Sequence, residues 1–146
     1  MSDEAIRPTQ ATVTRKEALE SLPVGAGTGT SRQHLTHPVP GSSFHMRRFI
    51  MEPGGGMPRH TNTVEHQQLV LRGRATIGLG PEEIQVQAGD VLHIPAGLPH
   101  WYRAEGDEAF EFLCAVPNEP DELRILGTED ESRDDPSQEP ETGGGC

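Results

Sequence analysis

Short runs of alternating apolar and polar residues fill the middle of the chain, and turns rich in glycine and proline separate them. Alternation with a period of two is typical of strands that bury one face. No run with helical periodicity lies between them, so the pattern favours an all-β sandwich or barrel over a parallel α/β fold. The predicted strands cover residues 44–52, 57–62, 66–72, 74–79, 83–87, 91–94, 99–104 and 109–116, with a ninth at 122–126.

The two ends of the chain lack this alternation. Residues 1–30 hold one helix-compatible stretch, 14–22, followed by a run of glycine, alanine and threonine at 25–30 that is typical of flexible segments. Residues 127–146 mix Glu, Asp, Ser, Pro and Gly without an apolar anchor, which is typical of disorder. The sequence therefore predicts a flexible N-terminal arm at 1–30, one β-domain at 31–126 and a disordered acidic tail at 127–146.

The charge and hydropathy of the chain argue against several classes of binding partner. The chain has 23 acidic and 12 basic residues and a net charge of −11, which argues against binding to nucleic acid or an anionic membrane. No apolar run approaches the roughly 20 residues of a membrane helix, and the acidic start is not that of a signal peptide. Cys114 lies in an apolar strand and Cys146 ends the tail, so no disulfide framework is predicted. We therefore expect a cytoplasmic protein that binds a small molecule.

Three histidines of the glycine- and proline-rich middle of the chain each share a strand face with a second polar residue. Residues two apart on a strand point to the same side of a sheet. The pairs are His60 with Asn62, His66 with Gln68, and His100 with Tyr102. If the sheet closes, all three pairs are expected to face one interior.

The stretch that begins at Gly54 resembles the first signature motif of the cupin superfamily, which reads G-x5-H-x-H-x3 or x4-E-x6-G. Gly54, His60 and Gly73 stand at the spacing of that motif. Asn62 occupies the position where the second histidine is usual, and His66 occupies the position of the glutamate. The chain thus resembles a cupin that lacks the usual carboxylate.

The stretch that begins at Gly89 resembles the second cupin motif, G-x5-P-x-G-x2-H-x3-N. Pro95 and Gly97 would form the turn that brings His100 to the barrel interior, and Ala104 replaces the final asparagine. The resemblance implies a single-domain antiparallel β-barrel, also described as a double-stranded β-helix or jelly roll. It also implies a homodimer paired through sheet edges, to which the N-terminal arm would contribute by exchange.

In such a barrel His60, His66 and His100 are expected to hold one divalent transition metal per chain, with Asn62 as a weak ligand or as the support of a bound water. Fe or Mn is favoured, and Zn, Ni or Cu also suits imidazole nitrogens. Because every ligand in this set is neutral, the ion would keep its full charge and favour an anionic ligand. A metal-free cupin whose histidines line a ligand pocket is the alternative.

The strand at 109–116 extends the resemblance to small single-domain cupins with the pattern H-x-H-x-x-E-H and a later F-L-C strand. Parity places Phe112 and Cys114 on one face of that strand, and both are predicted to contact the bound ligand or cofactor. Cys114 is interpreted as a small buried group rather than a nucleophile. Gln68 and Tyr102 are predicted to line the cavity as catalytic, substrate-orienting groups.

The remaining polar residues of the motif region are interpreted as structural. Glu65 is predicted to point outwards, and His93 is predicted to pack in the core rather than bind metal. His34, His37 and His45 are interpreted as surface or packing residues.

These features suggest a mononuclear metal-dependent enzyme of dioxygenase type, acting on a small anion that is enolisable, phenolic or a thiol. Two alternatives remain open. One is a non-catalytic module that binds a small ligand or regulates another protein, and the other is a metal-dependent isomerase or lyase.

Overall fold

The computed structural model describes residues 11–127 and 141–142. Within these ranges the regular elements are all strands, apart from η2 (Lys16–Ala18), which is a single 3-10 turn. The predicted all-β fold is confirmed. No helix in the described residues is long and apolar enough to cross a bilayer. The strands are β1 (Leu22–Pro23), β2 (Thr28–His34), β3 (Phe44–Asn62), β4 (His66–Arg72), β5 (Arg74–Leu79), β6 (Glu82–Gln87), β7 (Val91–Ile94), β8 (His100–Glu105), β9 (Phe110–Pro117), β10 (Glu122–Ile125) and β11 (Glu141–Thr142).

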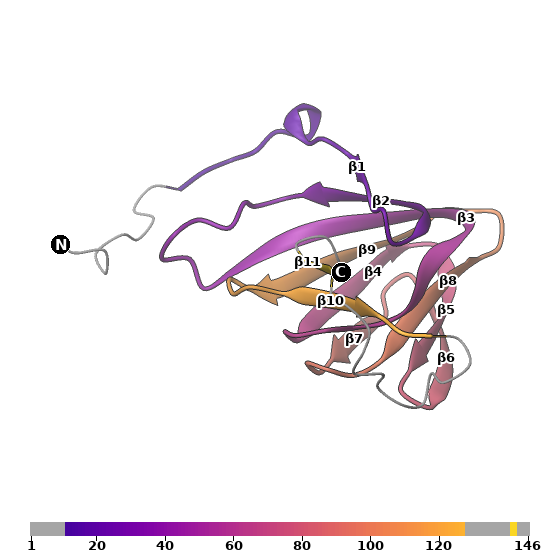
Figure 1. Ribbon diagram of the computed structural model, residues 1–146. Helices are drawn as coiled ribbons and strands as arrows, with labels where there is room; N and C mark the ends of the chain where they lie inside the picture. Colours follow the sequence, from indigo (N-terminus) through magenta and orange to yellow (C-terminus); the bar gives the residue numbers. More distant parts are fainter. Residues whose placement is uncertain (1–10, 128–140, 143–146) are drawn as a thin grey trace.

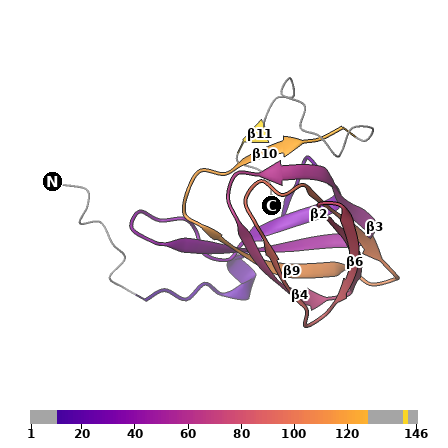
Figure 2. The same ribbon diagram turned by 90° about the horizontal axis from the view of Figure 1, so that it is seen from below.

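The strands form one antiparallel sheet that curls around a common interior (Figures 1 and 2). Its main path runs in the order β6-β5-β8-β3-β9-β4-β7. The long strand β3 lies at the centre and pairs with β2, β8, β9 and β10. One face of the curled sheet is therefore enclosed, as the cupin resemblance implied.

Strand β3 is longer than the sequence predicted. Residues 53–56, which the sequence analysis takes as a turn between two strands, continue the strand instead, so that prediction is wrong. The register of β2 against β3 shifts between Thr28 and Thr30, whose partners are Gly56 and Met51. Residues 52–55 of β3 lie between these two pairs and form a bulge. Gly54 in this bulge has a φ of 84°, which glycine adopts without strain. Pairing with β2 thus holds a proline-glycine run within the sheet.

The N-terminal boundary also differs from the prediction. Strand β2 begins at Thr28 and Val24 is buried in the core, so part of the predicted arm belongs to the folded sheet. The predicted helix-compatible stretch forms only the turn η2. The predicted disordered tail lies outside the described residues, apart from Gly127 and β11.

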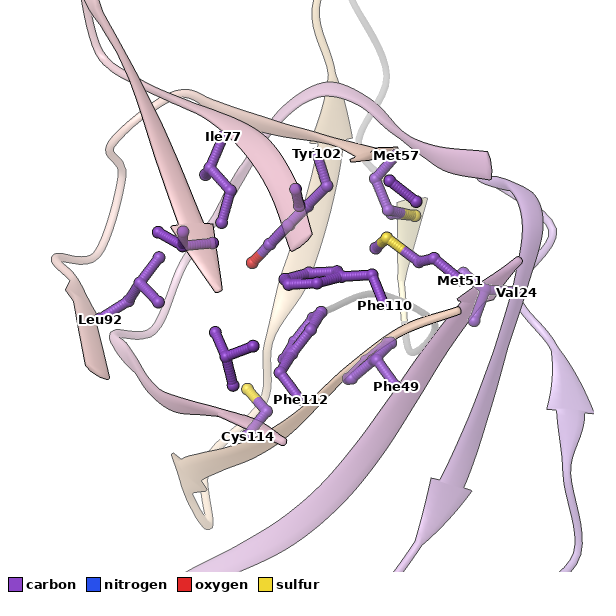
Figure 3. Close-up of a cluster of buried hydrophobic side chains, with 14 of the residues drawn as sticks. Val24, Phe49, Met51, Met57, Ile77, Leu92, Tyr102, Phe110, Phe112 and Cys114 are labelled. Carbon is purple, nitrogen blue, oxygen red and sulfur yellow. The ribbon is translucent and has the colours of Figure 1, made fainter. Parts of the chain in front are cut away.

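An aromatic stack fills the interior of the curled sheet (Figure 3). The ring of Phe112 lies between those of Phe49 and Tyr102, with centroids 5.2 Å away on each side. Phe110 packs against the same ring at 5.5 Å. The Tyr102 ring in turn lies 5.8 Å from the ring of His100, so the apolar core leads directly to the predicted histidine site.

Candidate metal centre

The structure brings the three predicted histidines together. His60 on β3 and His100 on β8 are register partners, and their ring centroids are 4.2 Å apart. His66, the first residue of β4, lies with its ring centroid 6.2 Å from that of His100. All three side chains are almost completely buried. The three histidines thus form one cluster, to which β3, β4 and β8 each contribute one side chain, as strand parity and motif spacing predicted.

The backbone fixes the orientation of His60 and His100 in the same way. The Nδ1 atom of His60 lies 2.7 Å from the carbonyl oxygen of Pro58, and Nδ1 of His100 lies 2.8 Å from that of Leu98. A carbonyl accepts only, so both Nδ1 atoms carry the proton. The Nε2 lone pairs are then available, and both Nε2 atoms are buried with no hydrogen-bond partner among the described residues.

Burial favours the neutral form of these two rings. It lowers the pKa of His60 to about 4, although the bond to Pro58 acts in the opposite direction. Burial, followed by the charge of His60, lowers the pKa of His100 well below its usual value. Both imidazoles are therefore neutral at physiological pH, which is the state that binds metal.

His66 has different surroundings. Its Nδ1 lies 3.6 Å from Sγ of Cys114, and its Nε2 lies 3.5 Å from Oδ2 of Asp121. Burial lowers the pKa of His66, but the interactions with Asp121 and Cys114 outweigh it and the net shift is upwards. Without a metal, His66 thus favours a proton where the other two histidines do not.

Asp121, which precedes β10, was missed by the sequence analysis. Its Oδ2 accepts a hydrogen bond from Nδ2 of Asn62 at 3.4 Å, and its Oδ1 accepts one from the backbone N–H of Thr63 at 3.1 Å. Burial raises the pKa of Asp121, but His66 and further positive neighbours outweigh it and lower the pKa overall. A carboxylate thus lies beside the predicted ligands, although neither motif supplies one. Asp121 stands outside both motifs, so spacing could not identify it.

The donor atoms fit a divalent transition metal. Besides the two Nε2 atoms, Oδ1 of Asn62 is buried without a hydrogen-bond partner in the described part of the chain. Imidazole nitrogens with an amide oxygen and a nearby carboxylate suit Fe, Mn, Zn, Ni or Cu. Among the described residues no group of three or more His, Cys, Asp or Glu side chains is arranged to hold an ion, so metal binding would require side chains to rearrange.

Gln68, Tyr102 and Cys114 form a polar group between the histidines and the core. Gln68 Nε2 donates a hydrogen bond to Tyr102 Oη at 2.8 Å and lies 3.7 Å from Sγ of Cys114. Phe112 is packed in the aromatic stack, with its side chain fully buried (Figure 3). The catalytic and ligand-contacting roles of these residues remain predictions.

Two other motif residues lie on the outer face. Glu65 is exposed, as predicted, and its Oε1 lies 2.8 Å from Nε2 of His93. His93 is exposed as well, so the prediction that it packs in the core is wrong. It lies opposite Gln67, the neighbour of buried Gln68, so the pleat turns it away from the interior.

Comparison with known families agrees with this geometry. The family model for the cupin domain matches residues 47–116, the stretch that carries all three histidines. Residues 47–116 therefore form a cupin domain. A solved cupin-2 domain structure from Rhodospirillum rubrum is 27% identical, with a TM-score of 0.70 over 86% of each chain. A polyketide cyclase from Streptomyces resistomycificus superimposes with a TM-score of 0.72 over 84% of this chain and 90% of its own, at 22% identity, and shows the fold alone.

One curated relative is similar to this cupin in sequence. It is the 1-methylthio-D-xylulose 5-phosphate methylsulfurylase of Rhodospirillum rubrum, which is 33% identical over 85 residues. These residues are 58% of this chain and 54% of the relative, so the match spans about half of the relative's length.

Proposed function

We propose that this cupin is a mononuclear metal-dependent enzyme that acts on a small anionic substrate. The observation that carries the proposal is the orientation of His60 and His100, whose Nε2 atoms are buried without hydrogen-bond partners and whose Nδ1 atoms face backbone carbonyls. A protein gains nothing from burying such acceptors unless a ligand or ion meets them. His60, His66 and His100 would hold the ion, with Asn62 beside them.

A bound Fe or Mn ion would supply Lewis-acid and redox chemistry at its open positions. The residues around it would orient the substrate. Gln68 Nε2 donates to Tyr102 Oη and so fixes the position of the phenol, which is the group proposed to hold a proton near a substrate oxygen. The aromatic stack below excludes water, because Phe110 and Phe112 are fully buried. This arrangement supports a dioxygenase-type reaction on an enolisable, phenolic or thiol anion.

Carbon–sulfur or isomerase chemistry is the second candidate, and the placement of Cys114 favours it. Its Sγ lies 3.6 Å from Nδ1 of His66 and 3.6 Å from Nη2 of Arg47. Cys114 therefore lies between the histidines and Arg47, in a position to contact a sulfur-containing substrate. The curated relative is named for a methylthio sugar phosphate, which makes that class of compound the natural first substrate to try.

Reconstitution with Fe(II) and Mn(II) distinguishes the candidates. We expect oxygen uptake with one member of a panel of diketones, catechols and thiols, and loss of uptake in His60→Gln. Turnover of a methylthio ketose phosphate without oxygen would favour the second candidate. Stoichiometric metal without turnover of any compound would instead leave a binding protein, and neither metal nor turnover would contradict the proposal.

A further inference from the structure

Four basic side chains lie together on the inner face of β2 and β3, next to the histidine site. We call them the cationic cluster: Arg32, His34, His45 and Arg47. His34 is the register partner of Arg47, and Arg32 is the partner of Phe49. Partners on antiparallel strands point to the same face, and Phe49 is fully buried in the interior. Parity along β3 adds His45 to the same face.

Arg47 is the buried member of the cationic cluster, with 5% of its surface exposed. Its guanidinium carbon lies 5.3 Å from the ring centroid of Phe49, and its Nη2 lies 3.6 Å from Sγ of Cys114. These contacts hold the planar guanidinium inside the curled sheet. The charge of Arg47 therefore lies inside the sheet, beside the Phe49 ring and the Cys114 thiol.

The two histidines of the cluster are half-buried and their Nδ1 atoms lack hydrogen-bond partners in the described structure. Burial, then the charges of Arg32 and Arg47, lower the pKa of His34. Burial, then Arg47, lower that of His45, and the opposing effects of Cys114 and Asp121 do not reverse the shift. The positive charge of the cluster therefore comes from Arg32 and Arg47, with the Asp121 carboxylate as a neighbour. A metal cation would be repelled there, whereas an anion would be attracted.

We propose that the cationic cluster is a subsite for the phosphoryl group of the substrate. Two guanidinium groups and two imidazoles offer donors from two strands, which suits the several oxygens and double charge of a phosphate monoester better than a single carboxylate. The inference rests on the proposed function, because it assigns the substrate class of that site.

Cys114 connects the subsite to the candidate metal centre. Its Sγ lies 3.6 Å from Arg47 Nη2 on one side and 3.6 Å from His66 Nδ1 on the other. Figure 3 shows Cys114 next to Phe112, at the edge of the aromatic core. A small phosphorylated compound anchored at Arg47 would thus place its other end beside the histidines.

Calorimetric titration of inorganic phosphate into the full chain tests the subsite, before and after treatment with a chelator. We expect binding that survives chelation and is weakened about tenfold by Arg47→Gln, since a hydrogen bond to a charged group contributes that much. Because Arg47 is buried, His45→Gln provides a second variant at a half-buried position, with an expected loss of about threefold. Circular dichroism checks that each variant folds.

Arg48→Gln is the matched control. It removes the same charge from the next residue of β3, which is bonded to Glu111 and Gln33 instead of the cluster. An equal loss in this control, no phosphate binding after chelation, or acetate binding as tight as phosphate would overturn the inference. Phosphate binding in a chain that takes up no metal even when Fe(II), Mn(II) or Zn(II) is added would contradict the proposed function alone, and metal binding without a phosphate site would contradict the subsite alone.

Discussion

At the scale of single residues, the site depends on which nitrogen of each histidine carries the proton. His60 and His100 each place Nδ1 against the carbonyl two residues earlier, at Pro58 and Leu98. The same local arrangement thus occurs in both sequence motifs, on different strands. It fixes the tautomer before any ligand arrives, so the proton does not have to move between the two ring nitrogens when a metal binds.

The buried neutral histidines make the metal-free chain sensitive to acid. His60 has a pKa of about 4 when folded and 6.5 when unfolded, so between these values the unfolded chain binds more protons. Its contribution is therefore complete above pH 6.5 and falls by about 3 kcal/mol as the pH drops towards 4. His100 acts in the same direction, while the raised pKa of His66 acts in the opposite one.

Urea unfolding of chelator-treated protein between pH 7.5 and pH 4.5, in steps of about half a unit, measures this effect. We expect the decline in unfolding free energy to be shallower in His60→Gln. The exposed His93→Gln should follow the parent chain. A decline that is identical in all three proteins would show that His60 does not cause it.

Asp121 is predicted to tune metal affinity. Its carboxylate lies against His66 and Asn62, so Asp121→Asn removes negative charge beside the ion and should weaken metal binding about tenfold. Glu122→Gln, the neighbouring exposed carboxylate, is the control and should change little. Isothermal titration with Mn(II) or Zn(II) gives both affinities, and equal losses in the two variants would mean that only net charge matters.

The histidines could be predicted from the sequence because they follow a regular spacing within two motifs. Asp121 could not, because it lies outside both motifs and follows no such spacing. Motif spacing and strand parity alone predict that His60, His66 and His100 face one interior. Asp121 reaches the site from a turn before β10, and only the pairing of β10 with β3 brings it there. Long-range pairing of this kind leaves no local pattern in the chain.

At the scale of elements, β3 organises the site. Its later half pairs with β8 on one edge and with β10 on the other, both at His60. The register shift between Met57 and His60 sets His60 opposite His100. The sequence predicted two strands here, because a proline-glycine run ordinarily ends a strand.

Gly56 allows the close approach of β3 to β8. A Cβ at this position would overlap the carbonyl oxygen of Tyr102, which is backbone and cannot rotate away. We expect Gly56→Ala to lower the free energy of unfolding by about 2 kcal/mol and to weaken metal binding. Gly25→Ala is the control, since nothing lies within 4 Å of a Cβ there. Urea unfolding checks both, and equal stability of the two variants would contradict this role.

At the scale of the whole molecule, charge is distributed unevenly. The chain carries a net charge of −11, yet the inner face of β2 and β3 presents Arg32 and Arg47 to the interior. A positive interior in an acidic protein attracts a small anion to one place. The sequence analysis missed β2 because residues 28–34 lack apolar alternation and so resemble a linker. Pairing with β3, rather than local propensity, makes that segment a strand.

The metal content of the purified chain decides whether His60, His66 and His100 form a metal site. Elemental mass spectrometry of the parent protein, after it has been loaded with metal and desalted, should find about one transition-metal ion per chain. His100→Gln should lose it, and His93→Gln, which changes an exposed histidine on the outer face, should retain it. A parent chain that keeps no metal, or equal retention in both variants, would contradict the account.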